Sequence, residues 1–156
     1  MLLSIVILSY NRPKQLGRIL DRFVGFYDER ISLVIKDDRS PRLDEIQGLF
    51  DEYKHKIDIE FDLYTNDVNL GYDLNLWDSF FTLDSDYIFL LSDDDYVETK
   101  YLSALLDQLK TTYFKFYFTP FTIRTKVYRD DFTNYSADNF GDFIYGSILF
   151  SGLIFN

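Results

Sequence analysis

Apolar, strand-like runs alternate with helical stripes over the first 110 residues of this chain, and this alternation restricts the fold more than any other feature. Leu3–Ser9, Ile31–Lys36 and Tyr87–Leu91 are almost continuously apolar, which is typical of strands covered on both faces. Ile57–Tyr64 alternates apolar with charged residues and predicts a strand with one wetter face. Strands separated by helices form parallel sheets through right-handed crossovers. We therefore expect an α/β fold, with a mostly parallel, twisted sheet and helices on both faces.

The segments between these strands predict helices. Asn11 is expected to cap the first helix, and Pro13 suits its first turn, where a missing N–H costs nothing. The apolar stripe of this helix is expected to extend as far as Phe26. Three more helices are expected, at residues 42–55, Leu74–Phe81 and Thr99–Lys110. In the third helix, we interpret the stripe of Trp77, Phe80 and Phe81 as core rather than as a surface that binds sugar.

Composition excludes several classes of protein. The formal net charge is −10, and Lys and Arg are scattered. A nucleic-acid partner is therefore not expected, because it requires a concentrated basic patch. The chain has no cysteine, so it has no disulfide, thiolate zinc site or cysteine nucleophile. This composition and the lack of a run of ~20 apolar residues favour a cytoplasmic protein, and leave peripheral contact with the inner face of a membrane open.

Polar side chains follow three of the four expected strands. They are Tyr10-Asn11-Arg12, Asp37-Asp38 and Asp93-Asp94-Asp95. Ligands of open parallel sheets bind outside the carboxyl ends of the strands, so we expect these groups to converge. Three consecutive carboxylates repel one another, and their hard oxygen atoms suit Mg²⁺ or Mn²⁺. The alternative is a solvated acidic turn that caps the helix at Thr99.

Four segments, taken in order, carry a specific resemblance to one family. They are Ser4–Pro13, Asp37–Ser40, Asn69–Tyr72 followed by Asn75, and Tyr87–Asp95. Together they resemble the family-2 glycosyltransferases of the Rossmann-like GT-A fold. The resemblance implies that residues 1–110 form the nucleotide-sugar-binding half of a single domain, residues 1–156. Residues 111–156 would begin the acceptor-side half.

The same resemblance implies an activity and residue roles. The activity is transfer of a sugar, with inversion, from a nucleotide-diphosphate donor to a saccharide or glycolipid acceptor, in polysaccharide or glycoconjugate synthesis. Tyr10 would line the nucleotide base, and Asp38 would accept a hydrogen bond from a base N–H. Asp94 and Asp95 would hold Mn²⁺ or Mg²⁺, which would neutralise the departing nucleoside diphosphate. The implied donor-binding residues are Ser9, Tyr10, Asn11, Arg12, Asp38, Asn69, Gly71 and Asp93.

The chain also departs from the family pattern. Ser92 stands where the first residue of the Asp-x-Asp metal motif often lies, so Asp93-x-Asp95 is a second assignment of that motif. Arg39 replaces a residue that is commonly glycine. The general base of the family lies in a later acidic motif, and Asp138 and Asp142 fall too early to match it. We therefore assign no catalytic residue and expect the acceptor half to be incomplete.

Two other functions stay open at this point. The first is a non-catalytic nucleotide-binding or assembly module, which the unmatched base motif favours. The second is a phosphohydrolase that uses Asp93–Val97 as an Asp-x-Asp-x-Val nucleophile motif. The final apolar run, Ser147–Phe155, also leaves open a homodimer formed through an unpaired last strand.

Overall fold

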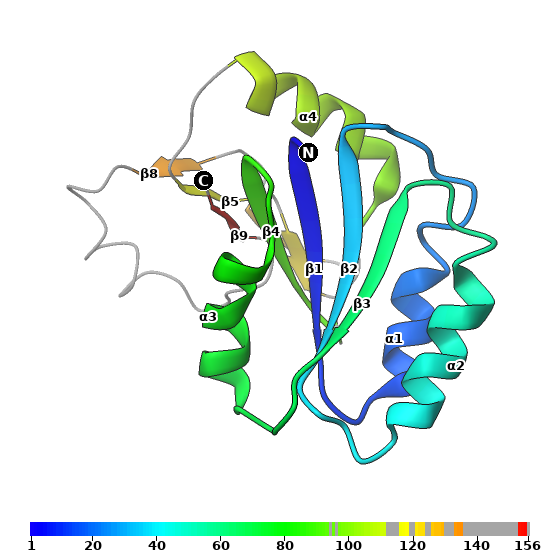
Figure 1. Ribbon diagram of the computed structural model, residues 1–156. Coiled ribbons are helices and arrows are strands. Elements are labelled where there is room, and N and C mark those ends of the chain that lie inside the picture. Colours follow the sequence, from blue (N-terminus) through cyan, green and yellow to red (C-terminus); the bar gives the residue numbers. More distant parts are fainter. Residues whose placement is uncertain are drawn as a thin grey trace.

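Four parallel strands form the centre of the molecule in the computed structural model, which describes residues 1–93, 95 and 97–111 and the backbone of five short strands beyond them (Figure 1). The central strands are β1 (Leu3–Ser9), β2 (Ile31–Asp37), β3 (Glu60–Thr65) and β4 (Tyr87–Ser92). They pair in the order β3-β2-β1-β4, and every pair is parallel. The expected α/β fold with a mostly parallel sheet is confirmed.

Three short strands extend the sheet beyond β4 with antiparallel pairing. They follow the order β4-β9-β5-β8 and are β5 (Phe116–Phe118), β8 (Thr133–Tyr135) and β9 (Leu153–Phe155). A separate two-stranded sheet is formed by β6 (Phe121–Ile123) and β7 (Lys126–Arg129). Because β9 pairs with both β4 and β5, the last strand is not an open edge, and the expectation that it is unpaired was wrong. A homodimer stays a prediction.

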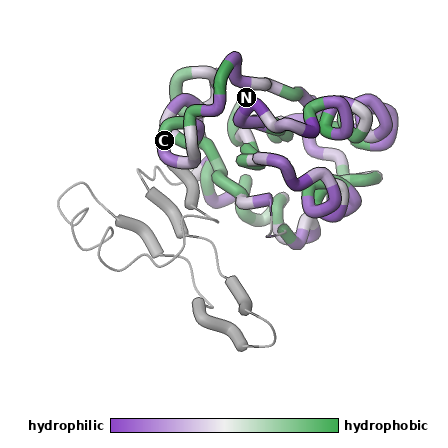
Figure 2. The backbone as a smooth tube through the Cα atoms, turned by 90° about the horizontal axis from the view of Figure 1, so that it is seen from below, coloured by the Kyte–Doolittle hydropathy of each residue, from purple (hydrophilic) through white to green (hydrophobic). Residues whose placement is uncertain are grey.

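Helices cover both faces of the parallel sheet (Figure 1). The side chains of α1 (Pro13–Leu20), α2 (Leu43–Tyr53) and α4 (Leu102–Thr111) share one core cluster with Ile5 and Ile7 of β1. α3 (Tyr72–Thr82) packs on the other face, against a cluster that contains Val6 and Leu8. Hydrophilic and hydrophobic residues alternate along the helices in Figure 2, as expected for helices that bury one side. Each fully buried aliphatic side chain contributes about 1.5–3 kcal/mol.

Several element boundaries differ from the sequence prediction, and the differences at α1 and β3 have a clear cause. α1 ends at Leu20, and the buried Phe23 follows in successive turns, with its N–H donating to the Leu20 carbonyl. The predicted stripe to Phe26 is therefore not one helix. β3 begins at Glu60 rather than Ile57, because Ile57 still belongs to the turn after α2, where its N–H donates to the Tyr53 carbonyl.

Asn11 does not cap α1, so that prediction was wrong. Arg12 occupies the N-cap position, with no side-chain hydrogen bond to the helix, and Pro13 lies in the first turn as expected. Asn11 has a φ of 58°, and its backbone N–H donates to Ser40 Oγ at 2.7 Å. The turn is thus held by a contact to the turn after β2, which sequence spacing within the helix does not reveal.

The outer face of α3 carries exposed aromatic residues. Trp77 is 60% exposed and Phe81 is 74% exposed, whereas Phe80 packs against the core. Interpreting the whole stripe as core was therefore wrong for Trp77 and Phe81. Side chains four positions apart share a helix face, so the face that carries Trp77 and Phe81 points away from the face that α3 buries through Asn75 and Ser79.

The fluorescence of Trp77 should report this exposure, because the chain has a single tryptophan. In the folded protein we expect emission typical of an indole in water, with acrylamide quenching nearly as efficient as in urea-unfolded protein. The measurement is a quenching titration of both states. A blue-shifted, weakly quenched emission from the folded chain would show that another surface covers α3.

None of the helices in the described part of the chain has the length and hydrophobicity needed to cross a bilayer.

Candidate functional site

The carboxyl ends of β1, β2 and β4 meet at one edge of the sheet. Ser9 at the end of β1 aligns with Asp37 of β2, and Leu8 aligns with Ser92 of β4. The N–H of Asp38 also donates to the Ser9 carbonyl at 3.0 Å. The expected convergence of the strand-end residues is therefore confirmed by the pairing of the strands.

Arg12 and Asp93 join the ends of β1 and β4. Arg12 Nη1 donates to Asp93 Oδ1 at 3.0 Å, and the Asp93 side chain is only 8% exposed. Asp93, the first acid of the triplet, is therefore not a solvated turn residue. The N-cap residue of the 3₁₀ turn at Thr99–Tyr101 is Glu98, which makes no side-chain hydrogen bond to that turn. The sequence indicated that the triplet needs a cation, and Arg12 provides one positive charge from within the chain.

Only part of the expected metal site can be compared with the structure. Asp94, one of the two expected metal ligands, lies outside the described residues, and its role stays a prediction. Among the residues that the structure describes, no group of three or more His, Asp or Glu side chains could hold a metal. The exposed Asp95 carboxylate fits a hard divalent cation chemically, whereas Asp93 shares an oxygen atom with Arg12. Asp95 thus remains the better of the two described candidates.

Asp37 and Ser40 tie the turn after β1 to the turn after β2. Asp37 is fully buried and accepts hydrogen bonds from the Ser40 N–H at 2.9 Å and from the Ser40 hydroxyl. Ser40 Oγ in turn accepts the Asn11 N–H. Asn11 and Arg39 both have φ near +60°, a conformation that glycine adopts readily, asparagine tolerates and arginine disfavours. This conformation gives a physical reason why glycine suits the position of Arg39.

Asp38 anchors the turn that precedes α3. The residue is 3% exposed, and its Oδ1 accepts hydrogen bonds from Asn66 Nδ2 and Leu70 N, both at 2.8 Å. Its Oδ2 accepts the Gly71 N–H at 2.8 Å, and the same N–H lies 3.1 Å from Asn69 Oδ1. A carboxylate offers about four acceptor positions, so three are used within the chain. The structure thus brings Asp38, Asn69 and Gly71 together, as the sequence predicted.

Ser9 and Tyr10 lie at the end of β1 in contrasting environments. Tyr10 is 46% exposed, so its ring is accessible to a ligand. Ser9 is 2% exposed, and its Oγ is the one buried side-chain oxygen or nitrogen atom of the described residues that lacks a hydrogen-bond partner. Of these two expected donor-binding residues, Tyr10 is therefore the one whose side chain reaches the surface.

A lysine close to this edge was not predicted from the sequence. The Lys36 side chain is 6% exposed and lies on the α3 side of β2, where its Nζ pairs with Asp78 Oδ2 at 2.5 Å. Donation from Lys36 holds the pKa of Asp78 below its ordinary value of 3.8. The available signal was a single charged residue at the end of the otherwise uncharged run Ile31–Lys36. Asn66 and Asn75 were also given no role, although Asn66 directly follows β3.

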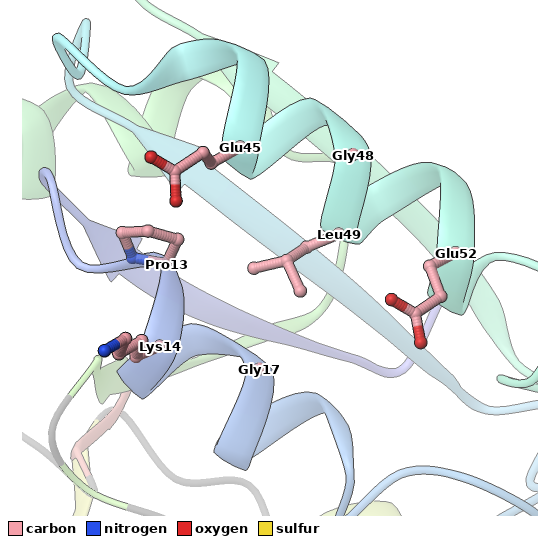
Figure 3. A pocket seen from close by; sticks show the side chains of 7 residues that line it. All are labelled: Pro13, Lys14, Gly17, Glu45, Gly48, Leu49 and Glu52. Carbon is pink, nitrogen blue, oxygen red and sulfur yellow. The ribbon is translucent and has the colours of Figure 1, made fainter.

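A hollow elsewhere on the surface does not belong to this site. It measures about 400 Å³ and lies between α1 and α2 (Figure 3). None of the expected donor-binding or metal-binding residues lines it, and we assign it no function. Its lining residues are Pro13, Lys14, Gly17, Glu45, Gly48, Leu49 and Glu52.

The fold and the converging strand ends define an α/β protein with its ligand site at the carboxyl edge of a parallel sheet. The chain belongs to glycosyl transferase family 2, whose family model matches residues 4–149. The GT-A fold implied by the resemblance is confirmed by solved structures of similar fold. No curated protein sequence matches the chain.

The similar solved structures include S. aureus TarS 1–349, at 15% identity and a TM-score of 0.59, with 74% of this chain and 34% of that chain covered. TarS 1–349 in complex with UDP-GlcNAc gives 17% identity and a TM-score of 0.58, with 74% and 33% covered. The mannosyltransferase PcManGT from Pyrobaculum calidifontis, in complex with GDP-Man and Mn²⁺, gives 10% identity and a TM-score of 0.61, with 78% and 35% covered. The chain spans about a third of the length of these proteins.

Proposed function

We propose that the chain forms the nucleotide-sugar-binding part of an inverting glycosyltransferase. Residues 1–110 would form the donor half of the domain, and residues 111–156 would begin the acceptor-side half. The observation that carries the proposal is the meeting of Arg12, Asp38 and Asp93 at the carboxyl edge of the sheet, in a chain of glycosyl transferase family 2. Neighbours in complex with UDP-GlcNAc, UDP and GDP-Man support a nucleotide-diphosphate donor.

Three residues of the site have chemistry suited to parts of such a donor. The exposed Tyr10 ring offers a flat surface for the base, and the remaining acceptor position of Asp38 suits a base N–H. The Arg12 guanidinium, with its side chain 48% exposed at the start of α1, can donate charge-assisted hydrogen bonds to a diphosphate. Base, ribose and diphosphate would then lie along the ends of β2, β1 and β4.

The reaction would need groups beyond this donor site. Asp94 and Asp95 would hold Mn²⁺ or Mg²⁺, which supplies Lewis-acid neutralisation of the leaving diphosphate when bound. The Mn²⁺ in the PcManGT complex supports this assignment. Inversion requires in-line attack by an acceptor hydroxyl, from a saccharide or glycolipid, with a carboxylate as general base. We assign no residue of this chain to the base, and the family match gives the phosphohydrolase alternative no support.

Calorimetric titration with UDP, GDP and TDP, each with and without Mn²⁺, tests the donor site. We expect one nucleotide to bind, more tightly with metal. Arg12→Ala should weaken binding about tenfold or more, the size expected for losing a charge-assisted hydrogen bond. Asp94→Ala should remove the metal dependence. The matched control is Asp84→Ala, which removes an exposed carboxylate before the amino end of β4, at the opposite edge.

The outcomes separate the remaining alternatives. No binding of any of the three nucleotides would contradict the proposal and the non-catalytic binding module alike. Binding without release of nucleotide from a nucleotide sugar, in the presence of saccharide acceptors, would favour the binding module. Equal weakening by Asp84→Ala and Arg12→Ala, which change the net charge in opposite directions, would show that a general effect of substitution on the fold, and not the site, lowers the affinity.

A further inference from the structure

We propose that Asn66 and Asn75 are positioning residues for the donor site. Neither is among the donor-binding residues expected from the sequence, and both are buried, at 9% and 3% exposure. They would hold Asp38 and the turn Asn69–Gly71 in the arrangement that receives the nucleotide. This inference rests on the proposed function, because the arrangement matters only where a nucleotide binds.

The two side chains form one continuous line of hydrogen bonds. Asn66 Nδ2 donates to Asp38 Oδ1 and to Asn75 Oδ1, both at 2.8 Å. Asn75 Nδ2 donates to the Lys36 carbonyl at 3.4 Å. An ionised carboxylate can only accept, so the Asn66 amide must present its nitrogen to Asp38. Both hydrogen atoms of that nitrogen are then used, which leaves the amide a single orientation.

This line of bonds connects three elements around the turn. Lys36 lies at the end of β2 and Asp38 directly follows this strand. Asn66 follows β3, and Asn75 lies in the first turn of α3. The turn Asn69–Gly71 lies between Asn66 and Asn75 in the sequence, so both of its ends are fixed. Buried polar groups are costly when unpaired, which disfavours any other arrangement of the network. The turn is therefore ordered before a ligand arrives.

A preordered turn matters for the nucleotide because it determines where Asp38 presents its remaining acceptor position. Oδ1 is held by Asn66 and Leu70, and Oδ2 is held by Gly71. Without Asn66, the carboxylate would retain only the two backbone donors of the turn itself. The nucleotide would then have to order the carboxylate and the turn together, and this ordering would reduce its affinity.

The test compares Asn66→Ala and Asn75→Ala with the control Ser32→Ala. Ser32 lies on β2 and loses a buried hydrogen bond of 2.8 Å to Ser4 Oγ, away from the carboxyl edge. The first measurement is amide hydrogen exchange of Leu70 and Gly71 in the ligand-free chain. The second is the Kd for the nucleotide that the wild-type chain binds, from the same panel of UDP, GDP and TDP.

We expect Asn66→Ala to raise both the exchange rates and the Kd by about tenfold, as for the loss of one buried hydrogen bond. Asn75→Ala leaves the Asn66–Asp38 contact in place and should act in the same direction with a smaller effect. It also serves as the test if Asn66→Ala does not fold. Ser32→Ala should lower the thermal stability while leaving the exchange of both amides and the Kd within about twofold.

If the amides of Leu70 and Gly71 exchange at the wild-type rate in folded Asn66→Ala and Asn75→Ala, the inference is overturned. This result would not depend on whether the chain binds a nucleotide. Faster exchange with an unchanged Kd would also overturn it, because the network would then serve the fold alone. An equal rise of the Kd in Ser32→Ala would assign the effect to general destabilisation. Failure of the wild-type chain to bind any nucleotide would instead overturn the proposed function, and the donor role of these residues with it.

Discussion

Replacing Asp38 with alanine should lower the free energy of unfolding by about 3 kcal/mol and remove nucleotide binding. The substitution leaves the side-chain N–H of Asn66 and the backbone N–H groups of Leu70 and Gly71 without their acceptor. A buried donor left unpaired costs about 1–3 kcal/mol. The total for these three donors should be lower than the sum of three such costs, because the turn can relax and let water reach some of them. Urea denaturation of the wild-type and variant chains measures the difference.

Two comparisons separate this effect from the loss of a negative charge. Asp38→Asn keeps one oxygen acceptor but turns an NH₂ group toward some of the same donors. Its free energy of unfolding should therefore lie between those of the wild type and Asp38→Ala. The exposed control Asp84→Ala should change the unfolding free energy by no more than about 0.5 kcal/mol. An Asp38→Ala chain as stable as the wild type would show that the three hydrogen bonds do not hold the turn.

Asp78→Ala should give the second large effect, a loss of about 2 kcal/mol. The variant leaves the Lys36 ammonium group buried without its carboxylate, and breaking a fully buried ion pair costs about 3–5 kcal/mol. The smaller value reflects the 44% exposure of the Asp78 side chain, which allows water to reach the ammonium group. Urea denaturation again provides the measurement.

The double variant Lys36→Met, Asp78→Ala is the control for this pair. It replaces the ion pair by apolar side chains, so most of the stability lost in Asp78→Ala should return. Lys36→Met alone should lower the free energy of unfolding less than Asp78→Ala does, because the Asp78 carboxylate that remains is partly solvated. A double variant less stable than either single variant would contradict the assignment of the loss to an unpaired buried charge.

The same pair should contribute to the pH dependence of stability. Lys36 lowers the pKa of Asp78 below its ordinary value of 3.8, so the folded chain binds fewer protons at this site than the unfolded chain. The contribution is therefore fully present above pH 3.8 and is lost as the pH falls through the lower folded pKa. Denaturation of wild type and Asp78→Ala at a series of acid pH values should show the two stabilities approaching each other.

Much of the fold could be predicted from the sequence because its causes are local. A strand buried on both faces requires a continuous apolar run, and the prediction for Leu3–Ser9 matches β1 residue for residue. Parallel pairing then places the strand ends at one edge, which is why Tyr10, Asp38 and Asp93 could be named together before their contacts were known. The helix stripes of α2 and α4 followed from the same periodic burial.

Contacts between distant residues could not be predicted in this way. Arg12 and Asp93 are 81 positions apart, and nothing in either segment specifies the other as a partner. The exposure of Trp77 likewise depends on which face of α3 meets the sheet. No role was predicted for Asn66 from the sequence, because a polar residue after a strand is common in turns.

The sequence by itself determined the order of the elements, the class of fold, the family resemblance and the edge at which the site lies, because apolar periodicity and short motifs express these directly. Only the tertiary structure decided that Arg12 neutralises part of the acid triplet and that Asp38 is held through Asn66 and Asn75. The physical reason is that a buried charge or amide is satisfied by whatever group the packing of other elements brings within hydrogen-bonding distance.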